Sequence, residues 1–520
     1  MNEVVRTLSW LDWTLVAAYF AVFAAIGVWC ARRQKSTEEY FVGGRAIPGW
    51  AAGLSLFATA ISTATFLAYP GHAFAGDWTR LWPGLMLPLV TVFLALVVIP
   101  FYRRVVRMSA YEFLEERFGY PARAYAAFLF IVVNVFRTGF ILFLTAAAIH
   151  TMTGWDIRWL IVGSGLITIA CTLAGGIDAV IWTDVMQAIV LLGGGLLCAG
   201  LLLFSVDGGP AHAISVAFEA NKFKLVDWSL DLTRPSVLVM TLFGLVAYAG
   251  IYTTGQDSVQ RYLAVPSLRQ AKRGMWLGTW SCVFTWILFM LIGTLLYSYY
   301  TVHPGQLPAA IAAKETQVFP YFVMTRLPPG MPGLVVAAML AAAMSTLETC
   351  MNSMAMVSIQ DLYHRLRPSS TDKQRLKLAM AATLFWGLLG TAAGLAMIHI
   401  ERALDFSYVV ASILGGGLFG LFLLAFFDRK THARGIYLGL AAGIAVTTWG
   451  TLDQIVGLVV PGGAGSRPKL FPFDPLLLVT LANAASFGVG YLASRLLPPA
   501  AKSNATSVTV WDPRPSTQPT

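Results

Sequence analysis

Long apolar runs recur along the whole chain, and short polar segments separate them. Most runs reach about 18 or more residues, which lets a helix cross a bilayer core about 30 Å thick. The pattern therefore predicts an all-α, polytopic integral membrane protein with about 13 transmembrane helices. The predicted spans are residues 10–31, 49–69, 82–101, 124–152, 157–175, 183–206, 235–255, 274–300, 332–363, 376–399, 405–427, 434–459 and 473–497.

The composition agrees with a protein that lies almost entirely inside a membrane. Hydrophobic residues make up 57% of the chain and charged residues only 12%, about half the charged fraction of a soluble domain. The net charge of +10 reflects Lys and Arg in cytoplasmic loops rather than a nucleic-acid partner. Neither a disulfide framework nor a zinc site is expected, because the cysteines occur singly in apolar segments. They are Cys30, Cys171, Cys198, Cys282 and Cys350.

Basic residues indicate how the spans are oriented. The first run, residues 10–31, is followed by ARRQK and has no small-residue cleavage site, so we expect a retained helix with its N-terminus outside. If segments alternate from there, about two-thirds of the 36 Lys and Arg residues fall in inner segments. The long outer loops near 207–234 and 301–331 carry few basic residues. We expect a multi-pass protein of the cell inner (plasma) membrane with a cytoplasmic C-terminus and a disordered tail, residues 498–520.

Some of the apolar runs are interrupted. SLFATAISTATFLAYPG has a polar centre, and LLGGGLLCAG and ILGGGLFG are dense in glycine. Most such glycines allow helices to pack closely. In secondary transporters, however, interrupted helices also expose backbone carbonyls that coordinate ions near the membrane midplane. Both interpretations stay open at this point.

Three ionisable residues lie inside apolar runs, namely Arg137, Asp184 and Glu348. An acidic group at mid-bilayer costs about 2.5–3.5 kcal/mol, and such groups mark ion or substrate pathways by default. Each also has a structural interpretation. Asp184 is near a predicted helix start, where it would cap the helix, and Arg137 would form an ion pair with Asp184 or Glu348.

Glu348 belongs to a polar stripe in LAAAMSTLETCMNS. At about 100° per residue, the polar residues fall within an arc of about 160°: Ser345, Thr346, Glu348, Thr349, Asn352 and Ser353. Hydroxyl and backbone oxygens near a carboxylate are ligands that a hard alkali cation prefers, as calcium and magnesium do. A transition metal is not expected, because no nitrogen or sulfur cluster is present. Hydroxyls that bond back to their own helix explain any single Ser or Thr, but not the carboxylate.

The chain resembles the sodium/solute symporter family over nearly its whole length, and within it the bacterial sodium-coupled sialic acid transporters. The resemblance rests on RRQKSTEEYFVGGRAIPGWAAGLSLFATAISTATFLAYPGHAFAGDW, SAYEFLEERFG, GGIDAVIWTDVMQ and AAAMSTLETCMNSMAMVSIQDLY. It implies a LeuT-like fold, an inverted repeat of five plus five helices. The implied units are an outer helix and loop (1–48), the first repeat (49–206), an outer loop (207–234), the second repeat (235–427), two C-terminal helices (428–497) and the tail (498–520).

The resemblance also implies site residues, with Na⁺ as the bound ion. The main sodium site falls on the backbone oxygens of Ala58, Ile61 and Ala342 and the hydroxyls of Ser345 and Thr346. A second cation site comprises Asp184, Ser345, Glu348 and Thr349, and a substrate site comprises Ser62, Thr65 and Arg137. The guanidinium of such an arginine grips a carboxylate through two parallel hydrogen bonds.

The chain departs from the sialic acid branch at two positions. Glu348 stands where the branch has a serine, so the second site would hold two carboxylates and would bind Na⁺ or, second, a proton. Gly84 stands about where the branch has a glutamine, which removes one expected substrate contact.

The predicted function is sodium-coupled import of a small organic solute by alternating access. Arg137 favours an organic anion, such as a sugar acid like sialic acid, another monocarboxylate or a pantothenate-like acid, over a neutral sugar. A membrane-embedded enzyme is disfavoured because no His, Asp and Glu cluster is apparent, and a sensor because the short tail leaves no room for a signalling domain. A channel is a further alternative, and saturable, sodium-dependent counterflow would identify a carrier rather than a channel. The expected partners are the solute, sodium ions and the lipid bilayer, with no nucleic acid.

Overall fold

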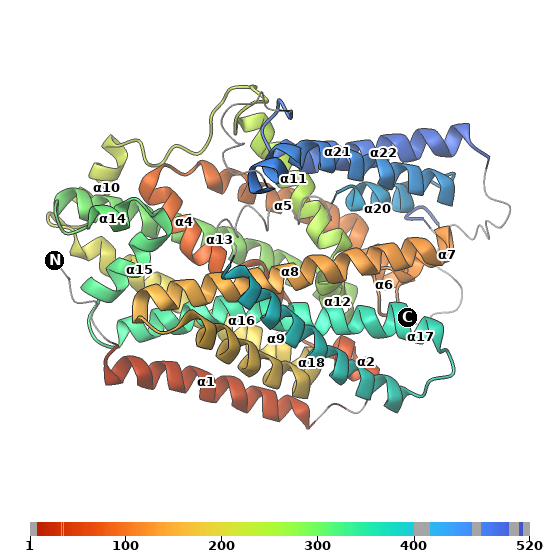
Figure 1. Cartoon of the computed structure of the whole chain (residues 1–520), viewed down its shortest axis with the longest axis horizontal. Helices are drawn as coiled ribbons and strands as arrows, with labels where there is room; N and C mark the ends of the chain where they lie inside the picture. The colour runs from red at the N-terminus through yellow and green to blue at the C-terminus, as the bar shows by residue number, and fades with distance from the viewer. Residues whose placement is uncertain are drawn as a thin grey trace.

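The computed structural model of the chain describes residues 8–32, 34, 36–399, 416–459, 470–498 and 509–512. The helices lie side by side and mostly run along the long axis of the molecule (Figure 1). Among the described residues, β structure is limited to one isolated bridge between Asp227 and Ser236. The predicted all-α class is therefore confirmed.

Within the residues that the structure describes, ten helical segments are long and apolar enough to cross a membrane. They are α1 (Trp10–Ala31), η2 to α6 (Thr79–Val105), α8 (Tyr120–Thr153), the second part of α9 (Gly175–Ser205), α11 (Val237–Thr254), α13 (Leu268–Val302), α16 to α17 (Met331–Leu366), α18 (Asp372–Met397), α21 (Ala433–Val459, whose apolar part is Ala433–Leu452) and α22 (Leu477–Leu496). A bent pair, α3 (Gly49–Ala60) and α4 (Thr63–Ala75), makes an eleventh if it is one span.

Two shorter apolar helices occupy the places of further predicted spans. They are Ile157–Leu173 and α20 (Leu418–Phe427). The predicted span 405–427 is described only from residue 416 onward, and its earlier part lies outside the described residues. The total of thirteen spans therefore stays a prediction.

The sharp bend in α9 (Ile157–Ser205) lies at Gly176, where φ is 55° and ψ is −150°. A Cβ at Gly176 would lie 2.6 Å from the backbone oxygen of Tyr40 in α2 (Thr37–Val42), so only glycine fits this close approach. The second membrane segment of α9 thus begins at Gly175 rather than at the predicted residue 183. Asp184 consequently lies well inside a helix, and the prediction that it caps a helix start is wrong.

In the described part of the chain, non-helical backbone interrupts two helices beside the candidate site. The α3–α4 pair bends by 60° around Ile61 and Ser62. The second break is at Gly255, with φ −75° and ψ 118°, between α11 and α12 (Gln256–Ala264). The polar centre of the first run predicted the first break. The sequence assigned residues 256–264 to a loop, which is wrong, because all nine residues of α12 are helical and buried.

Close helix packing surrounds the first break. A Cβ at Gly53 would meet the backbone oxygen of Gly274 at 2.4 Å, and a Cβ at Gly293 would meet the oxygen of Pro70 at 2.1 Å. These contacts hold α13 tightly against α3 and α4. Next to them, α16 (Met331–Val357) is buried along nearly its whole length. Among the glycines interpreted as packing residues, the interpretation is correct for Gly71, where a Cβ would meet the backbone oxygen of Glu315 at 2.6 Å, and wrong for Gly193 and Gly200, where no described atom would lie within 4 Å of a Cβ.

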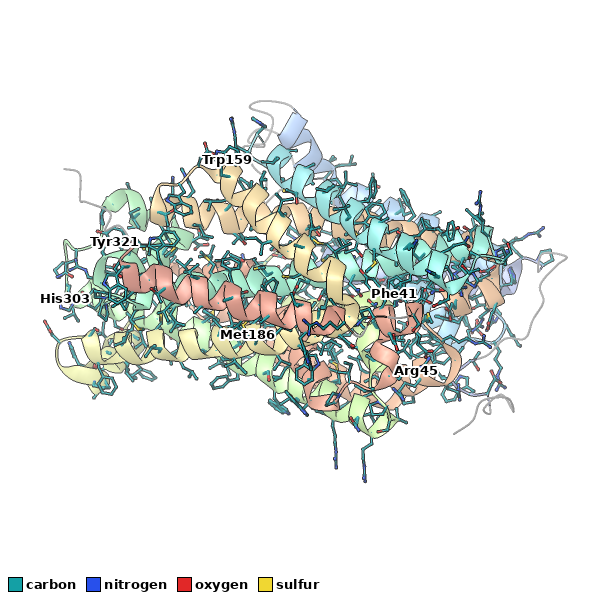
Figure 2. The ribbon with its side chains drawn as sticks, turned by 90° about the horizontal axis from the view of Figure 1, so that it is seen from below. Phe41, Arg45, Trp159, Met186, His303 and Tyr321 are labelled. Atoms are coloured by element: carbon teal, nitrogen blue, oxygen red, sulfur yellow. The ribbon has the colours of Figure 1, made fainter. Side chains whose placement is uncertain are left out.

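The segments predicted as outer and inner loops gather at opposite ends of the molecule. The elements α10 (Gly209–Glu219), α14 (Ala309–Ala312) and α15 (Glu315–Arg326) lie at one end, and α7 (Glu112–Phe118) and α17 (His364–Leu366) at the other (Figure 1). Figure 2 shows His303 and Tyr321 at the first end and Arg45 toward the second. This arrangement agrees with alternation of the spans, while the side of the membrane that each end faces stays a prediction.

Four residues of the predicted disordered tail are docked on the protein. Both terminal nitrogens of Arg104 donate to this segment, to the backbone oxygens of Asp512 and Thr509, each at 2.8 Å. The indole nitrogen of Trp511 donates to the backbone oxygen of Phe427 at 3.1 Å. The prediction of disorder is therefore wrong for residues 509–512, and residues 499–508 and 513–520 lie outside the described part.

Candidate functional site

Oxygen atoms of α3 and α16 meet beside the first helix break. Because α3 ends at Ala60, the carbonyls of Ala58 and Thr59 have no helical N–H partner. The hydroxyl of Ser345 donates to Ala58 O at 2.9 Å, and the hydroxyl of Thr346 lies 3.4 Å from Thr59 O. The same hydroxyls lie 3.2 and 3.5 Å from the carbonyl oxygen of Ala342.

Four of the five residues predicted for the main sodium site are thus brought together: Ala58, Ala342, Ser345 and Thr346. The fifth, Ile61, is the extended residue at the break itself, with φ −97° and ψ 110°. All the converging groups are uncharged oxygens, which suit a hard monovalent cation. Groups of three or more His, Cys, Asp or Glu side chains that would suit a transition metal are absent from the described part of the chain.

A second cluster surrounds Arg261, a residue of α12 that is 1% exposed. Its guanidinium forms an ion pair with Asp184, with 3.0 Å between Nη2 and Oδ2. Asp184 also accepts a hydrogen bond from Ser55 of α3. The remaining acceptors of the guanidinium are Ser55 Oγ (2.7 Å), Thr59 Oγ1 (3.0 Å), Thr349 Oγ1 (2.7 Å) and Asp257 O (2.8 Å). Arg261 therefore ties the broken helices α3 and α11–α12 to α9 and α16.

The sequence analysis missed Arg261 because QDSVQR follows the span 235–255 and is polar enough to suggest an inner loop. One signal was available. Asp257 and Arg261 are four residues apart, a spacing that places opposite charges on the same face of a helix. That spacing indicated a helix, but not that the helix turns back into the protein.

Glu348 is fully buried and near Asp184. Its Oε2 accepts a hydrogen bond from the hydroxyl of Thr183 at 2.8 Å, and Thr183 directly precedes Asp184 in α9. The other oxygens, Oε1 of Glu348 and Oδ1 of Asp184, are buried and have no donor in hydrogen-bonding geometry among the described residues. If both carboxylates are ionised, Arg261 balances only one of them. The cluster then has a net charge of −1, which one monovalent cation would neutralise.

Arg137 of α8 contacts the backbone at the first helix break, between α3 and α4. Its Nη2 donates to Thr59 O at 3.1 Å, and its Nη1 is 3.8 Å from Oδ2 of Asp257. The predicted structural partners, Asp184 and Glu348, are therefore wrong, since Asp184 pairs with Arg261 instead. The Arg137 side chain is 34% exposed, whereas that of Asp257 is 9% exposed, so the guanidinium retains free donors.

The guanidinium of Arg137 faces a cavity of about 30 Å³ at the junction of both broken helices. The lining residues are Leu56, Thr59, Ala60, Arg137, Ile251, Tyr252, Asp257, Ser258 and Arg261. The other predicted substrate residues, Ser62 and Thr65, lie at the start of α4 beside the same break and are half-buried and 9% exposed respectively. This volume is close to that of one water molecule, so an organic solute fits only after the helices around the break separate.

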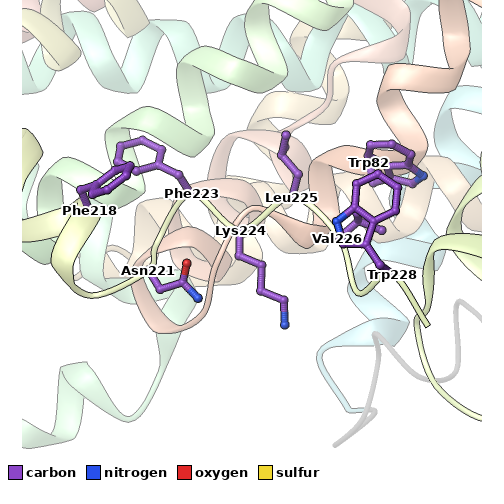
Figure 3. A pocket seen from close by; sticks show the side chains of 8 residues that line it. All are labelled: Trp82, Phe218, Asn221, Phe223, Lys224, Leu225, Val226 and Trp228. Atoms are coloured by element: carbon purple, nitrogen blue, oxygen red, sulfur yellow. The ribbon is translucent and has the colours of Figure 1, made fainter.

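A larger hollow lies near α10 (Figure 3). Its volume is about 550 Å³, and none of the predicted site residues lines it. The lining residues are Trp82, Phe218, Asn221, Phe223, Lys224, Leu225, Val226 and Trp228. We therefore assign the candidate site to the Arg137 cavity and to the two clusters beside it. One cluster comprises the oxygens of Ala58, Ser345 and Thr346, and the other comprises the groups around Arg261.

At the end of the molecule where α7 and α17 lie, charged side chains join α7 and α8 to α17 and η4 (Ser358–Tyr363). Arg123 contacts Asp361 at 2.6 Å and Glu115 at 2.9 Å, and Arg365 contacts Glu115 at 2.5 Å. Burial raises the pKa of Glu115, but the hydrogen bonds from Arg365 and Arg123 outweigh it and hold that pKa below its usual value. Glu115 is therefore ionised at neutral pH, and these ion pairs link α7 and α8 to η4 and α17.

Comparison with known proteins gives consistent matches. The chain matches the Sodium:solute symporter family over residues 40–443. It is 33% identical over 444 residues to the sodium/sialic acid symporter SiaT of Proteus mirabilis (strain HI4320), covering 84% of this chain and 88% of that protein. It is 28% identical over 465 residues to the sodium-coupled monocarboxylate transporter 2 of Homo sapiens, covering 87% of this chain and 74% of that protein.

Solved structures show the same fold. The substrate-bound outward-open state of a Na⁺-coupled sialic acid symporter, a structure described as revealing a novel Na⁺ site, has a TM-score of 0.84 at 30% identity, covering 94% of this chain and 99% of that one. Mhp1, a nucleobase-cation-symport-1 family transporter, has a TM-score of 0.52 at 16% identity, covering 88% of this chain and 94% of that one. The second likeness concerns the fold alone, which is LeuT-like.

Proposed function

Because the chain belongs to the sodium:solute symporter family, which makes it a sodium-coupled membrane transporter and not an enzyme, we propose that its cargo is a carboxylate-bearing organic solute. Sialic acid is the first candidate, since the symporter of Proteus mirabilis that is 33% identical to this chain carries it. The observation that supports this proposal is that an oxygen cluster and a one-third exposed arginine, Arg137, meet at one helix break.

Arg137 supplies the expected contact with the cargo. Its guanidinium is positioned by the carbonyl of Thr59 and lies near Asp257, at 3.8 Å. A substrate carboxylate would accept two parallel hydrogen bonds from the remaining donors. Ser62 and Thr65 would add hydroxyl groups from the start of α4. This arrangement favours an anion over a neutral sugar.

Sodium would couple to transport by joining α3 to α16. The proposed ligands of the ion are the backbone oxygens of Ala58, Ile61 and Ala342 and the hydroxyls of Ser345 and Thr346. When Na⁺ binds, the two hydroxyls would turn their lone pairs toward the ion instead of donating to carbonyls. A ligand shifts a conformational equilibrium only through different affinities for the two states. Separation of α3 from α16 would dismantle the site, so the ion favours the state in which they touch.

A second cation would bind between the two buried carboxylates. Its proposed ligands are the free oxygens of Asp184 and Glu348, together with the hydroxyls of Ser345 and Thr349. Arg261 already donates to Thr349, so that hydroxyl would have to be shared. A Na⁺-coupled sialic acid symporter of known structure has a novel Na⁺ site, which supports more than one ion. Na⁺ is the first candidate here and a proton the second.

The number of ions determines how strongly the protein concentrates its cargo. One Na⁺ with a monoanion is electroneutral, and a tenfold sodium gradient then gives about tenfold accumulation, or about 1.4 kcal/mol. Two Na⁺ with a monoanion draw on the sodium gradient twice, for about 2.7 kcal/mol, and carry one net positive charge, which adds about 2.3 kcal/mol at 100 mV. The total of about 5 kcal/mol corresponds to accumulation of several thousandfold. A second cation would therefore suit uptake of a dilute nutrient.

Replacing Glu348 should change the charge that accompanies each solute. In proteoliposomes, we expect the wild type to carry one net positive charge per anion and Glu348→Ala to carry none, because one cation ligand is lost. Glu348→Gln is the matched control for shape, since its amide oxygen can still accept from Thr183, and it should behave like the alanine variant. Current per transported solute is the measurement. An unchanged charge ratio together with an unchanged pH dependence would remove Glu348 from coupling.

Sodium dependence tests the proposed function as a whole. Vesicles with the purified protein should accumulate a sugar acid such as sialic acid, or another monocarboxylate, when Na⁺ is outside and not when choline replaces it. Ser345→Ala should raise the sodium concentration for half-maximal uptake more than it raises the solute concentration for half-maximal uptake. Equal accumulation of every tested anion in Na⁺ and in choline contradicts the proposal. Equal effects of Ser345→Ala on both concentrations contradict the placement of the ion.

A different monocarboxylate is the second candidate cargo, supported by the 28% identity to a sodium-coupled monocarboxylate transporter.

For the architecture, we propose thirteen spans with an N-terminus outside and a cytoplasmic C-terminus. The breaks at Ile61 and Gly255, one in each half, support an inverted repeat of residues 49–206 and 235–427. Saturable counterflow would distinguish this carrier from a channel.

A further inference from the structure

Four residues near the C-terminus, Thr509–Asp512, form a turn that is closed by its own side chains and is called the tail turn below. The backbone N–H and the hydroxyl of Thr509 both donate to Oδ2 of Asp512, at 2.7 and 2.6 Å. The other oxygen, Oδ1 of Asp512, forms an ion pair with Arg429 at 2.6 Å. The hydrogen bonds from Thr509 and the charge of Arg429 hold the pKa of Asp512 below its usual value. Its carboxylate is therefore ionised at neutral pH and keeps the turn closed.

The tail turn joins α6 to α20. Arg104 of α6 (Ile99–Val105) donates to two backbone carbonyls of the turn, each at 2.8 Å. The backbone N–H of Val510 donates to a carbonyl in the last turn of α20 at 3.0 Å. The ring of Trp511 also lies on α20, with its centroid 6.0 Å from that of Phe427. The tail turn therefore bridges two helices that are far apart along the chain.

The α6 end of this bridge is tied to the second helix break. The hydroxyl of Tyr102 donates to the carbonyl of Thr253, just before the break, at 2.5 Å. Arg103 donates to the carbonyls of Tyr262 and Val265, at the far end of α12, each at 2.8 Å. Because α6 thus holds both ends of α12, a movement of α12 must also move α6.

The α20 end belongs to a different group of helices. Arg117 of α7 donates to the backbone carbonyls of Ala425 and Asp428. The side chain of Asp428 forms an ion pair with Arg495 of α22 at 2.9 Å. These contacts attach the end of α20 to α7 and α22. The tail turn therefore connects the broken helix α11–α12, through α6, to the group of α7, α20 and α22.

We propose that the tail turn is an autoinhibitory strap, which restrains α6 and α12 against α20 and thereby slows the opening of the Arg137 cavity. That cavity, about 30 Å³ and lined in part by α12, must widen before an organic solute fits. The direct contact of α6 with α20, between the rings of Phe101 and Phe426 at 4.6 Å, is apolar and non-directional. The hydrogen bonds of Arg104 need a defined geometry, so they break when the two helices shift. The C-terminal segment would then limit the transport rate without touching ion or solute.

Hydrogen exchange of the purified protein without solute tests the strap. In a chain that ends at residue 508, the backbone amides of α12 should exchange about threefold faster or more, because losing a few hydrogen bonds shifts a local opening by that order. Trp511→Ala should have the same effect. A chain that ends at residue 513 retains the tail turn and is the matched control, which should exchange like the wild type. Faster exchange confined to α20, or the same increase in both shortened chains, overturns the inference.

Sodium-driven uptake in proteoliposomes gives a second readout, which a purely structural role would not raise. The maximal uptake rate should increase about threefold in the chain that ends at residue 508 and in Trp511→Ala. Arg104→Gln should raise the rate of the full-length protein but have no further effect in that shortened chain, because its partner is absent. An unchanged or lower rate in the shortened chain, or additive effects of Arg104→Gln, overturns the inference. The exchange measurement needs no solute, so a failure of the proposed cargo is distinguishable from a failure of the strap.

Discussion

Arg261→Met is expected to be the most destabilising single substitution in the site. The change leaves Asp184 buried and without its cationic partner, and removing one partner of a buried ion pair costs about 3–5 kcal/mol. The hydroxyls of Ser55, Thr59 and Thr349 also lose their shared donor. We therefore expect the thermal unfolding temperature of the purified protein to fall sharply, or the folded protein to be lost from the membrane fraction.

A second substitution distinguishes the unpaired charge from the loss of packing. In Arg261→Met with Asp184→Asn, the buried charge is gone and the amide oxygen still accepts from Ser55. Replacing both members of a buried pair by neutral groups is often nearly neutral, so the double variant should regain most of the lost stability. It should fold yet show weaker cation coupling in uptake, since Asp184 is a proposed cation ligand. A double variant as unstable as the single one would contradict the role of Arg261 as the internal counter-ion.

Loss of Arg137 should abolish uptake while the protein still folds. Truncating one partner of a desolvated charge pair costs about 2–5 kcal/mol, which is on the order of 30-fold to several thousandfold in apparent solute affinity. Arg137→Ala should therefore show no measurable sodium-driven anion uptake. Arg137→Lys keeps the charge but not the two parallel donors, so it should recover only part of the activity.

The control for Arg137 is Arg158→Gln, at an exposed position on α9. It should transport like the wild type. Sodium-dependent thermal stabilisation should persist in Arg137→Ala, because none of the proposed sodium ligands is altered. Wild-type anion uptake by Arg137→Ala would show that the carboxylate is held elsewhere. Loss of sodium stabilisation in that variant would mean that its effect is structural.

The helical architecture could be predicted from the sequence because the length of an apolar run is a local property. The first predicted span, 10–31, coincides with α1, and the span 332–363 lies within Met331–Leu366. The stripe on α16 was also local, since a period of 3.6 residues places Ser345 and Thr346 on one face. The family resemblance, carried by continuous motifs, is confirmed over residues 40–443.

The helix breaks and the tail were predicted less well. A polar centre indicated the break at Ile61, but Gly255 looked like the end of a span, so α12 was assigned to a loop. The kink at Gly176 moved the start of a helix by several residues and took Asp184 out of a capping position. A Pro-, Ser- and Thr-rich composition did not reveal that Trp511 docks on Phe427. In each case, the outcome depended on a contact with another segment.

The sequence by itself determined which segments are membrane helices, which helix bears the hydroxyls and carboxylate, and to which family the chain belongs. Only the tertiary structure decided which charges pair, because the partners are far apart along the chain. Arg261 reaches Ser55 across 206 residues, and Arg137 meets Asp257 rather than Asp184. A buried charge requires a counter-charge, but its identity depends on how broken helices cross, and no local pattern encodes that crossing.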